Sequence, residues 1–358
     1  MSQSIILAVI IIGTLGVPAF AGGPGVAPAN DPQVVYEGRV AVAPDGSVRL
    51  GFPGVTVHIQ FRGRSLLLKA RANKDNFVDV IVDDGPPVQL RLAAGDGSYA
   101  LVQSPVTSDH AVTVVRCNES WQGTITVLGF DAGADGLLLP ARELPLRKLM
   151  FIGDSVTCGE MCAWTPQPDP ARGTDANARL SYGMILSKAL GAQCVLVSYG
   201  GRGLIRDWQG NMDAGNAPVF YELALPDDQA VPWNHRLYVP DAIGIQLGTN
   251  DFSRGVPDEN QFLNAYVEFV RKIQRDAPQA LLFLMESPIL SDSPMQGPRR
   301  SVLRGYLEEV VHRIASPKVI LAPLSHYPGV PGNGHPTGTE HRKMAAELEP
   351  LLRRELGW

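Results

Sequence analysis

Four short motifs carry residue types that could perform nucleophilic chemistry, and each follows an apolar run or precedes the last helical pattern. They are Gly153-Asp154-Ser155, Gly200-Gly201-Arg202-Gly203, Gly248-Thr249-Asn250-Asp251 and Asn333-Gly334-His335-Pro336-Thr337. A serine hydroxyl is a weak nucleophile that needs an imidazole to take its proton, and the oxyanion formed by its attack needs hydrogen-bond donors. The four motifs together supply all of these groups, and we therefore predict a serine hydrolase.

The role of each residue follows from its chemistry. Ser155 supplies the hydroxyl, and its backbone N–H lies at a strand-to-helix turn where such donors point outward. Gly201 offers a backbone N–H that no side chain obstructs, and Asn250 offers an amide donor. His335 is then the general base, which returns its proton to the leaving alcohol.

Each of these residues also has an ordinary structural interpretation. A Gly-Asp-Ser tripeptide is a turn in most sequences, the glycine run could be a flexible loop, Asn250 could be a cap, and His335 could be an exposed loop residue. Only their occurrence in this order, at expected strand ends, favours the hydrolase. The other six histidines lack such a setting, and we expect surface or packing roles for them.

The second half of the chain contains the elements that must position these residues. Apolar runs at residues 149–152, 194–198, 242–247, 281–285 and 319–321 alternate with helical patterns. Near-continuous apolarity is typical of parallel strands covered on both faces. One helix is expected between residues 257 and 277 with Asp258 as its N-cap, and another is expected to end at Gly191. The pattern predicts a three-layer α/β/α domain with a parallel sheet.

The first half has the period of β-structure. Short runs at residues 55–61, 65–70, 77–82, 111–115 and 124–128 are separated by turn signals such as Asp45-Gly46, Arg62-Gly63 and Asp96-Gly97. No helical stretch lies among them. We therefore expect an antiparallel β-sandwich, with a jelly roll as the favoured version.

The two ends of the chain complete the expected organisation. Residues 1–21 carry no charged side chain and finish in Ala19-Phe20-Ala21, a pattern typical of a cleaved signal peptide, with an uncleaved anchor as the alternative. The expected divisions are a signal peptide at residues 1–21, the β-sandwich at 30–145 and the hydrolase domain at 146–358. A secreted or periplasmic location follows, with no stable membrane span after cleavage.

Composition limits the classes of partner. The 358 residues include 31 Lys and Arg against 36 Asp and Glu, which gives a net charge of -5 without a basic cluster. A nucleic-acid-binding surface normally has a basic excess, so no nucleic-acid partner is expected. The four cysteines are Cys117, Cys158, Cys162 and Cys194. They allow three disulfide pairings after export, while buried free thiols are the alternative. Their spacing does not suit a zinc site, and we expect neither metal nor cofactor.

The sequence resembles the SGNH (GDSL) hydrolases, with Ser155, Gly201, Asn250 and His335 standing for the four lettered residues. Within that superfamily, residues 147–159, Ser181-Tyr182-Gly183 and Val231-Pro232-Trp233 are similar to segments of carbohydrate esterase family 2, whose members place a jelly-roll domain before the hydrolase. The resemblance implies an acetylxylan esterase type of enzyme, which removes O-acetyl groups from xylan or glucomannan through an acetyl-enzyme.

One position departs from the pattern of that superfamily. The acid that commonly precedes the histidine by two or three residues is replaced by Asn333 and Gly332. Asn333 could hold the imidazole through its side-chain oxygen, or main-chain carbonyls could do so, but an amide cannot stabilise an imidazolium as a carboxylate does. We expect a reduced dependence on an acid rather than inactivity.

Three further residues are candidates for contact with the substrate. Trp233 and Trp164 lie in loops that contain proline and could stack on a sugar ring, although packing roles are as plausible. Arg202 could orient an acyl or sugar oxygen, or form a surface salt bridge. The expected substrate is an acetylated polysaccharide or oligosaccharide.

The sequence leaves two other functions open. A lipolytic short-chain esterase or thioesterase would use the same residues on a longer acyl group. A carbohydrate-binding protein with weak catalysis would account for the missing acid.

Overall fold

The computed structural model describes residues 25–167 and 173–358, so the expected signal peptide lies outside the described residues. The chain divides into two compact units. The second unit comprises Pro145–Trp358 together with two short segments, Phe52–Gly54 and Glu119–Trp121, that come from loops of the first half. Of the described residues, no helix is long and apolar enough to cross a membrane.

The first unit is an antiparallel sheet, and the predicted all-β domain is confirmed. Its main strand order is β3-β4-β9-β5-β8-β6-β7, with β1 paired to β9 and both β2 and β10 paired to β5. The strands are β1 (Val26–Pro28), β2 (Val34–Glu37), β3 (Val40–Val42), β4 (Val48–Leu50), β5 (Thr56–Ala72), β6 (Asn76–Val82), β7 (Val88–Leu92), β8 (Gly95–Arg116), β9 (Ile125–Asp131) and β10 (Leu137–Leu138).

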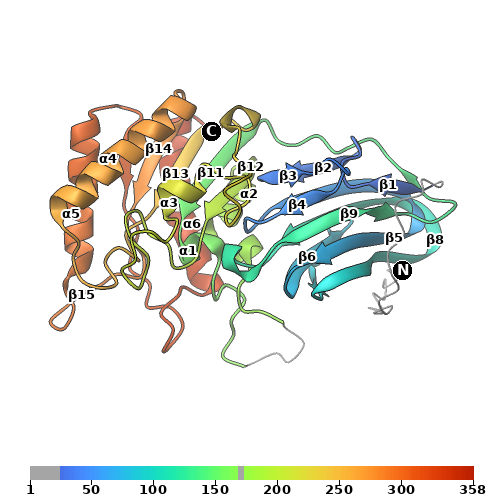
Figure 1. The fold of residues 1–358 in the computed structure, drawn as a ribbon, viewed down its shortest axis with the longest axis horizontal. Helices are drawn as coiled ribbons and strands as arrows, with labels where there is room; N and C mark the ends of the chain where they lie inside the picture. Colours follow the sequence, from blue (N-terminus) through green and yellow to red (C-terminus); the bar gives the residue numbers. More distant parts are fainter. Residues whose placement is uncertain (1–24, 168–172) are drawn as a thin grey trace. The chain divides into compact units, whose positions relative to one another are not determined.

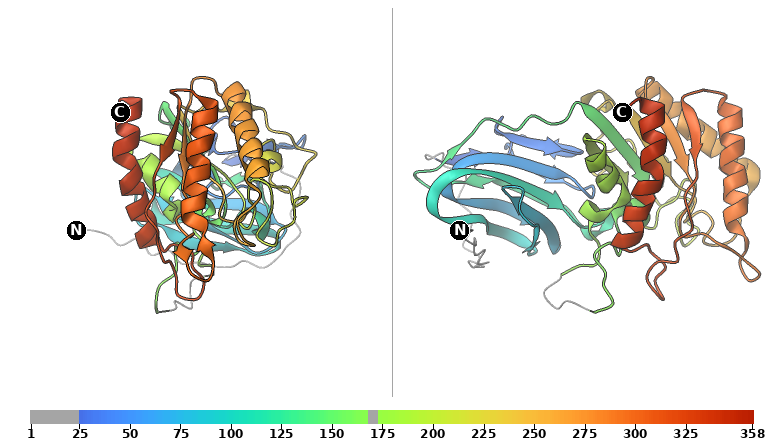
Figure 2. Two further views of the ribbon diagram at one scale, coloured as in Figure 1. Left: turned by 90° about the vertical axis from the view of Figure 1, so that its left-hand side faces the viewer. Right: turned by 180° about the vertical axis from the view of Figure 1, so that it is seen from behind.

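The sheet is curved along its two longest strands, β5 and β8. The turn signal at Arg62-Gly63 does not end a strand, because β5 runs through it as one strand of 17 residues. The pairing of β5 with β8 shifts register between Gly63 and Ser65, and such a bulge bends a strand and increases its twist. The curvature of β8 is visible in Figures 1 and 2. The described part of this unit is therefore one antiparallel sheet that bends along its two longest strands.

The second unit is built on a five-stranded parallel sheet in the order β12-β11-β13-β14-β17. Its strands are β11 (Arg147–Gly153), β12 (Ala192–Ser198), β13 (Ala242–Gln246), β14 (Leu281–Met285) and β17 (Val319–Ala322). Every residue of β12, β13 and β14 is buried, as predicted for strands covered on both faces. A separate short hairpin joins β15 (Asp292–Ser293) to β16 (Gly297–Pro298).

Helices cover both faces of this sheet, which confirms the three-layer prediction. Figures 1 and 2 show α2 and α6 on one face and α3 and α4 on the other, while α5 packs on α4 and β17. The helices are α1 (Ser155–Cys158), α2 (Tyr182–Ala189), α3 (Ala217–Phe220), α4 (Glu259–Asp276), α5 (Arg299–Ile314) and α6 (Gly338–Leu356), with short 3-10 turns at Ser120–Gln122, Ala178–Leu180 and His235–Leu237.

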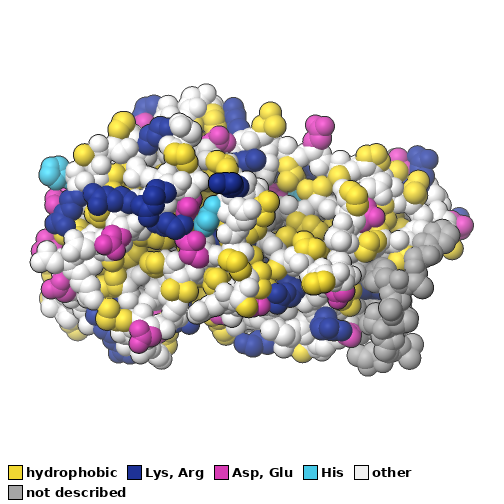
Figure 3. Space-filling model, turned by 45° about the horizontal axis from the view of Figure 1, so that its top comes forward, with side chains coloured by type: hydrophobic (Ala, Val, Ile, Leu, Met, Phe, Trp, Pro, Cys, Tyr) yellow, Lys and Arg dark blue, Asp and Glu magenta, His cyan; other side chains and the backbone are white. Residues whose placement is uncertain are grey.

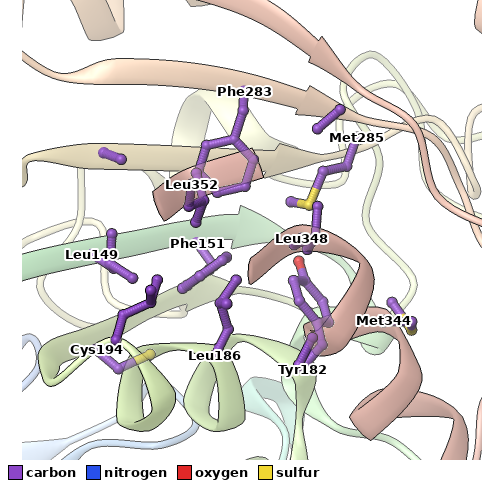
Figure 4. Packing of buried hydrophobic residues seen from close by; sticks show 14 of the residues in the cluster. Leu149, Phe151, Tyr182, Leu186, Cys194, Phe283, Met285, Met344, Leu348 and Leu352 are labelled. Carbon is purple, nitrogen blue, oxygen red and sulfur yellow. The ribbon is translucent and has the colours of Figure 1, made fainter. Parts of the chain in front are cut away.

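A dense apolar core fixes α2 and α6 to the sheet. Phe151 of β11 lies edge-on to both Tyr182 of α2 and Phe283 of β14. Leu348 and Leu352 of α6 close the same cluster, as Figure 4 shows. Each buried side chain of this size stabilises the fold by about 1.5–3 kcal/mol. The strand ends, which carry the candidate site, are thus held on a rigid framework.

All four cysteines are buried thiols that form no disulfide with one another. Burial raises the pKa of the Cys158 and Cys162 thiols well above their ordinary value. Of the alternatives left open by the sequence, the structure has the buried free thiols.

Candidate active site

The register of the parallel sheet brings three of the sequence motifs to one edge. Gly153 at the end of β11 pairs with Ser198 of β12 on one side and with Gln246 of β13 on the other. The residues that follow these three positions therefore emerge together at the carboxyl ends of the strands, where open α/β sheets hold their reactive groups.

Ser155 and His335 meet at this edge although 180 residues separate them. The hydroxyl Oγ of Ser155 lies 2.8 Å from Nε2 of His335, which is within hydrogen-bond reach for proton transfer. Ser155 is the first residue of α1, whose N-cap is the buried Asp154. His335 lies two residues before the Thr337 N-cap of α6. A reciprocal capping box between Thr337 and Glu340 fixes the start of α6 and so the end of the histidine loop.

Asn333 occupies the place of the missing acid. Its Oδ1 lies 2.6 Å from Nδ1 of His335 and also accepts a hydrogen bond from the backbone N–H of His335 at 3.2 Å. Because a backbone N–H can only donate, the amide must present its oxygen rather than its nitrogen. The same oxygen then requires the proton on Nδ1, which leaves the lone pair of Nε2 facing the Ser155 hydroxyl. The asparagine thus sets the tautomer that a general base needs, without adding a negative charge.

Burial lowers the pKa of His335 from its ordinary value to about 4. In the part of the chain that the structure describes, the ring nitrogens of His335 contact Asn333 and Ser155 rather than a carboxylate that would favour the imidazolium. The imidazole is therefore neutral, and able to accept a proton, across the neutral pH range.

As a consequence, we expect kcat/KM to decline only at strongly acidic pH. The neutral imidazole is the active form, so kcat/KM should hold through the neutral range and be lost on the acid side only as the pH falls through about 4. Asn333→Asp places a charge beside Nδ1 and should move this acid limb of the profile upward by about 1–3 pH units. The measurement is kcat/KM for an aryl acetate from pH 3.5 to 8, with circular dichroism at each pH to exclude unfolding. A wild-type limb near 6.5 that Asn333→Asp leaves in place would contradict the assigned role of Asn333.

The loop after β12 is shaped so that Gly201 lies at the site. Gly201 has φ +77°, a left-handed conformation that favours glycine, and a Cβ there would come within 2.9 Å of the Trp208 ring. Asp251, which is buried after β13, accepts hydrogen bonds from the backbone N–H groups of Leu204, Ile205 and Arg206. The loop is therefore clamped from the neighbouring strand end.

Asn250 joins the same two strand ends. Its Nδ2 donates to the carbonyl oxygen of Arg202 at 2.8 Å, which orients the amide and leaves its second N–H for another acceptor. Asn250 and Ser155 are each only 8 % exposed. Donors held this firmly need no reorganisation when an oxyanion forms between them.

One cavity of about 560 Å³ contains all of these groups, and every residue that lines it belongs to the second unit. The four predicted site residues line it, as does Arg202. The other lining residues are Glu119, Trp121, Glu160, Tyr199, Gly200, Asp207 and Trp208.

Sequence reasoning missed most of that second group. Trp208 follows the Gly200-Gly201 motif closely, so attention to the whole loop after the strand could have found it. Glu119 and Trp121 arrive on a loop between strands of the first half, and no local pattern indicates that they join the hydrolase site.

Of the three residues predicted to contact the substrate, one lines the cavity and two do not. Arg202 lines the cavity, lies over the Tyr199 ring and approaches Asp207 at 4.0 Å. Trp233 and Trp164 are not among the lining residues. The backbone N–H of Trp233 donates to the carbonyl oxygen of Glu222, beside the bridge between Leu223 and Pro232. Trp233 is therefore part of a loop structure outside the cavity.

A separate polar group brings together Glu222, His235 and Asp276, whose potential ligand atoms lie within 4.8 Å of one another. The ammonium of Lys272 lies 2.8 Å from Glu222 and 2.6 Å from Asp276. The ammonium of Lys272 therefore already pairs with both carboxylates. Figure 3 shows Lys and Arg side chains beside Asp and Glu elsewhere too, on the face of the molecule that it presents.

Comparison with known proteins agrees with this geometry. Residues 36–141 match the model for the carbohydrate esterase 2 N-terminal domain, and residues 151–343 match the GDSL-like lipase/acylhydrolase family. A protein named acetylxylan esterase / glucomannan deacetylase, from Cellvibrio japonicus (strain Ueda107), is 39% identical over 337 residues, which are 92% of this chain and 91% of that protein.

Solved structures give the same result. A family two carbohydrate esterase from Cellvibrio japonicus superposes with a TM-score of 0.87 at 38% identity, covering 93% of this chain and 98% of that one. A family two carbohydrate esterase from Clostridium thermocellum, in complex with cellohexaose, has a TM-score of 0.83 at 28% identity, with 91% and 99% covered. The resemblance found in the sequence is confirmed: the chain belongs to carbohydrate esterase family 2 and is a carboxylic ester hydrolase.

Proposed function

We propose that this enzyme removes O-acetyl groups from polysaccharides of the xylan or glucomannan type, with Ser155 as nucleophile and His335 as general base. The observation that carries the proposal is the 2.8 Å contact of Ser155 Oγ with His335 Nε2, in a cavity that also contains Gly201 and Asn250. The name of the relative from Cellvibrio japonicus supports the choice of substrate.

The reaction proceeds in two halves. Nε2 of His335 takes the hydroxyl proton while Oγ of Ser155 forms a bond to the acetyl carbon. The resulting oxyanion accepts hydrogen bonds from the backbone N–H groups of Ser155 and Gly201 and from the Asn250 amide. The bond to the sugar oxygen then breaks, and His335 returns the proton to that oxygen. Water repeats the sequence on the acetyl-enzyme, which releases acetate and restores Ser155.

Two tryptophans provide a surface for the sugar. Trp121 and Trp208 line the cavity and remain 50 % and 53 % exposed, which is unusual for such large apolar side chains. Aromatic rings with an apolar face and a polar edge suit a pyranose, which alternates C–H faces with hydroxyl edges. We assign to these two residues the stacking role that sequence reasoning gave to Trp233 and Trp164.

Trp208→Ala should raise KM for acetylated polysaccharide about tenfold while changing KM for a small aryl acetate less than twofold. Stacking acts on the sugar and not on the acetyl group, and a tenfold change corresponds to about 1.4 kcal/mol, within reach of one aromatic contact. Trp208→Tyr is the matched control, since it keeps a ring against Gly201. Equal effects of Trp208→Ala on both substrates would show that Trp208 only supports the loop.

Export forms part of the proposal. Residues 1–21 have the signal-peptide pattern, so the mature protein should begin at Gly22. N-terminal sequencing of protein from the medium or periplasm tests this, and an intact N-terminus there would overturn it.

The substrate class is tested by acetate release from acetylated xylan, acetylated glucomannan and a series of aryl esters. We expect release from at least one polysaccharide and a preference of about 10²-fold or more for acetyl over octanoyl esters, as a pocket can discriminate by several methylene groups. A preference for octanoyl esters would favour the lipolytic alternative.

A further inference from the structure

Two carboxyl groups in the cavity have no part in the reaction described above. Glu119 and Glu160 both line the cavity, and their side chains hydrogen bond to each other. Glu119 is almost fully buried, at 2 % exposed. Two ionised carboxylates at hydrogen-bond distance repel strongly, so such a contact requires a proton between them.

Each member of the pair is attached to a different part of the candidate site. Glu160 directly follows the nucleophile turn, and its backbone N–H donates to the carbonyl oxygen of Ser155 at 3.1 Å. Glu119 lies against the loop that carries Gly201, because a Cβ added to Gly200 would clash with its Oε2. The contact between the two side chains therefore links the nucleophile turn to the glycine loop.

Glu119 also holds an aromatic wall of the cavity. The indole Nε1 of Trp121 donates to Oε2 of Glu119 at 2.5 Å. The hydroxyl of Ser120, between these two residues, donates to the carbonyl oxygen of Ser198 at the end of β12. The segment from Glu119 to Trp121 is thus joined through Ser120 to the strand end that leads into the glycine loop, and its two larger side chains bond to each other.

The surroundings of the pair favour the protonated form. Burial raises the pKa of Glu119 to about 8, and the nearby carboxylates of Glu160 and Asp154 act in the same direction. Burial also raises the pKa of Glu160; the contact with Glu119 acts against this shift, and Asp175 adds to it. The Cys158 thiol interacts with Glu119 and the Cys162 thiol with Glu160, and both are neutral because burial raises their pKa well above the ordinary value. Across the cavity the titratable or charged residues are Tyr199, Arg202, Asp207 and His335.

We propose that Glu119 and Glu160 form a positioning pair that shares one proton, joins the Ser155 turn to the Gly200-Gly201 loop, and uncouples them when hydroxide removes that proton. The inference rests on the function proposed above and adds an alkaline limit to it. Loss of the proton leaves two carboxylates in contact, and their repulsion displaces the glycine loop and Trp121.

The first test is the alkaline side of the rate profile. For the wild type, kcat on an aryl acetate should fall at least fivefold between pH 6.5 and 9.5, after subtraction of the rate with Ser155→Ala. In Glu160→Gln the side-chain amide can donate to Glu119. Because an amide does not lose its protons in this pH range, the contact should persist at alkaline pH. The ratio of kcat at pH 9.5 to kcat at pH 6.5 in this variant should therefore rise to about one, whatever its absolute rate. Glu119→Gln should do the same by the reciprocal contact.

Glu308→Gln is the matched control, because Glu308 is an exposed carboxylate on α5. It should keep the wild-type profile. An alkaline fall that persists unchanged in Glu160→Gln and Glu119→Gln, or a wild-type rate that does not fall by pH 9.5, would overturn the proposal.

A second measurement does not depend on catalysis. In Ser155→Ala protein, tryptophan fluorescence should change between pH 7 and 10 as Trp121 loses its partner. The change should be absent when Glu160→Gln or Trp121→Phe is added. If it persists in both double variants, the pair does not hold Trp121. If the fluorescence change depends on the pair in this way, but protein that keeps Ser155 hydrolyses no ester, the pair stands and the proposed function fails.

Discussion

Ser155→Ala should lower kcat for acetate release from acetylated xylan by about 10⁴-fold or more, since removing the nucleophile of a serine hydrolase leaves only binding and the oxyanion donors to act. The hydroxyl lies 2.8 Å from His335 Nε2, and its oxygen can form an acyl-enzyme. Acetate release under steady-state conditions measures the effect.

The fold should survive this substitution, because it removes only the Ser155 hydroxyl and its contact with His335 Nε2. Ser301→Ala serves as the control: its hydroxyl contacts Asp292 near the start of α5, and it should hydrolyse at the wild-type rate. Near-normal acetate release by folded Ser155→Ala would mean that another group performs the attack.

Asn250→Ala should lower kcat by about 10²–10³-fold while KM changes less than threefold, which is the range measured when one side-chain oxyanion donor is removed. The amide meets the substrate oxygen at full strength only when negative charge develops on it, so the loss falls on the transition state. The measurement is kcat and KM for an aryl acetate. Asn250→Asp, which keeps the size but removes the donor, should be at least as impaired.

Asn264→Ala is the control for this prediction, because Asn264 is an exposed amide on α4. It should leave both constants unchanged. If Asn250→Ala instead raises KM with kcat intact, Asn250 binds the substrate before reaction and does not stabilise the oxyanion.

The sheet of the hydrolase unit could be predicted from the sequence because its strands are buried on both faces. A short, unbroken apolar run such as that of β14 is typical of a buried strand, and its predicted bounds, 281–285, are those of the strand. Once the strands are known to be parallel, their carboxyl ends must share an edge, and Ser155, Gly201 and Asn250 follow. The predicted N-cap of α4, Asp258, is also confirmed, because capping is a local interaction.

The parts that could not be predicted depend on contacts between distant segments. The Arg62-Gly63 pair has the composition of a turn, but pairing with β8 on one side, and of Arg62 with β10 on the other, holds it inside β5. Glu119 is an ordinary acid in sequence, and only the fold places it against Gly200 and Glu160. Trp233 shows the reverse: its loop contains the right residue types but lies outside the cavity.

The role of Asn333 could be predicted only in part. Its position two residues before His335 made a contact with the imidazole conceivable, and the structure has that contact at 2.6 Å. The direction of the amide, however, follows from the second hydrogen bond with the backbone N–H of His335. A sequence gives no information on that bond, because it depends on the backbone conformation of the loop.

Labelling with a serine-directed phosphonate, followed by peptide mass analysis, shows directly whether Ser155 is the nucleophile. We expect a single phosphonylated residue, Ser155, with labelling slowed by acetylated xylan and abolished in Ser155→Ala. Acetate release should fall in proportion to the labelled fraction. Full acetate release from protein that carries no label on Ser155, or a label on another residue that alone accounts for the lost activity, would contradict this role of Ser155.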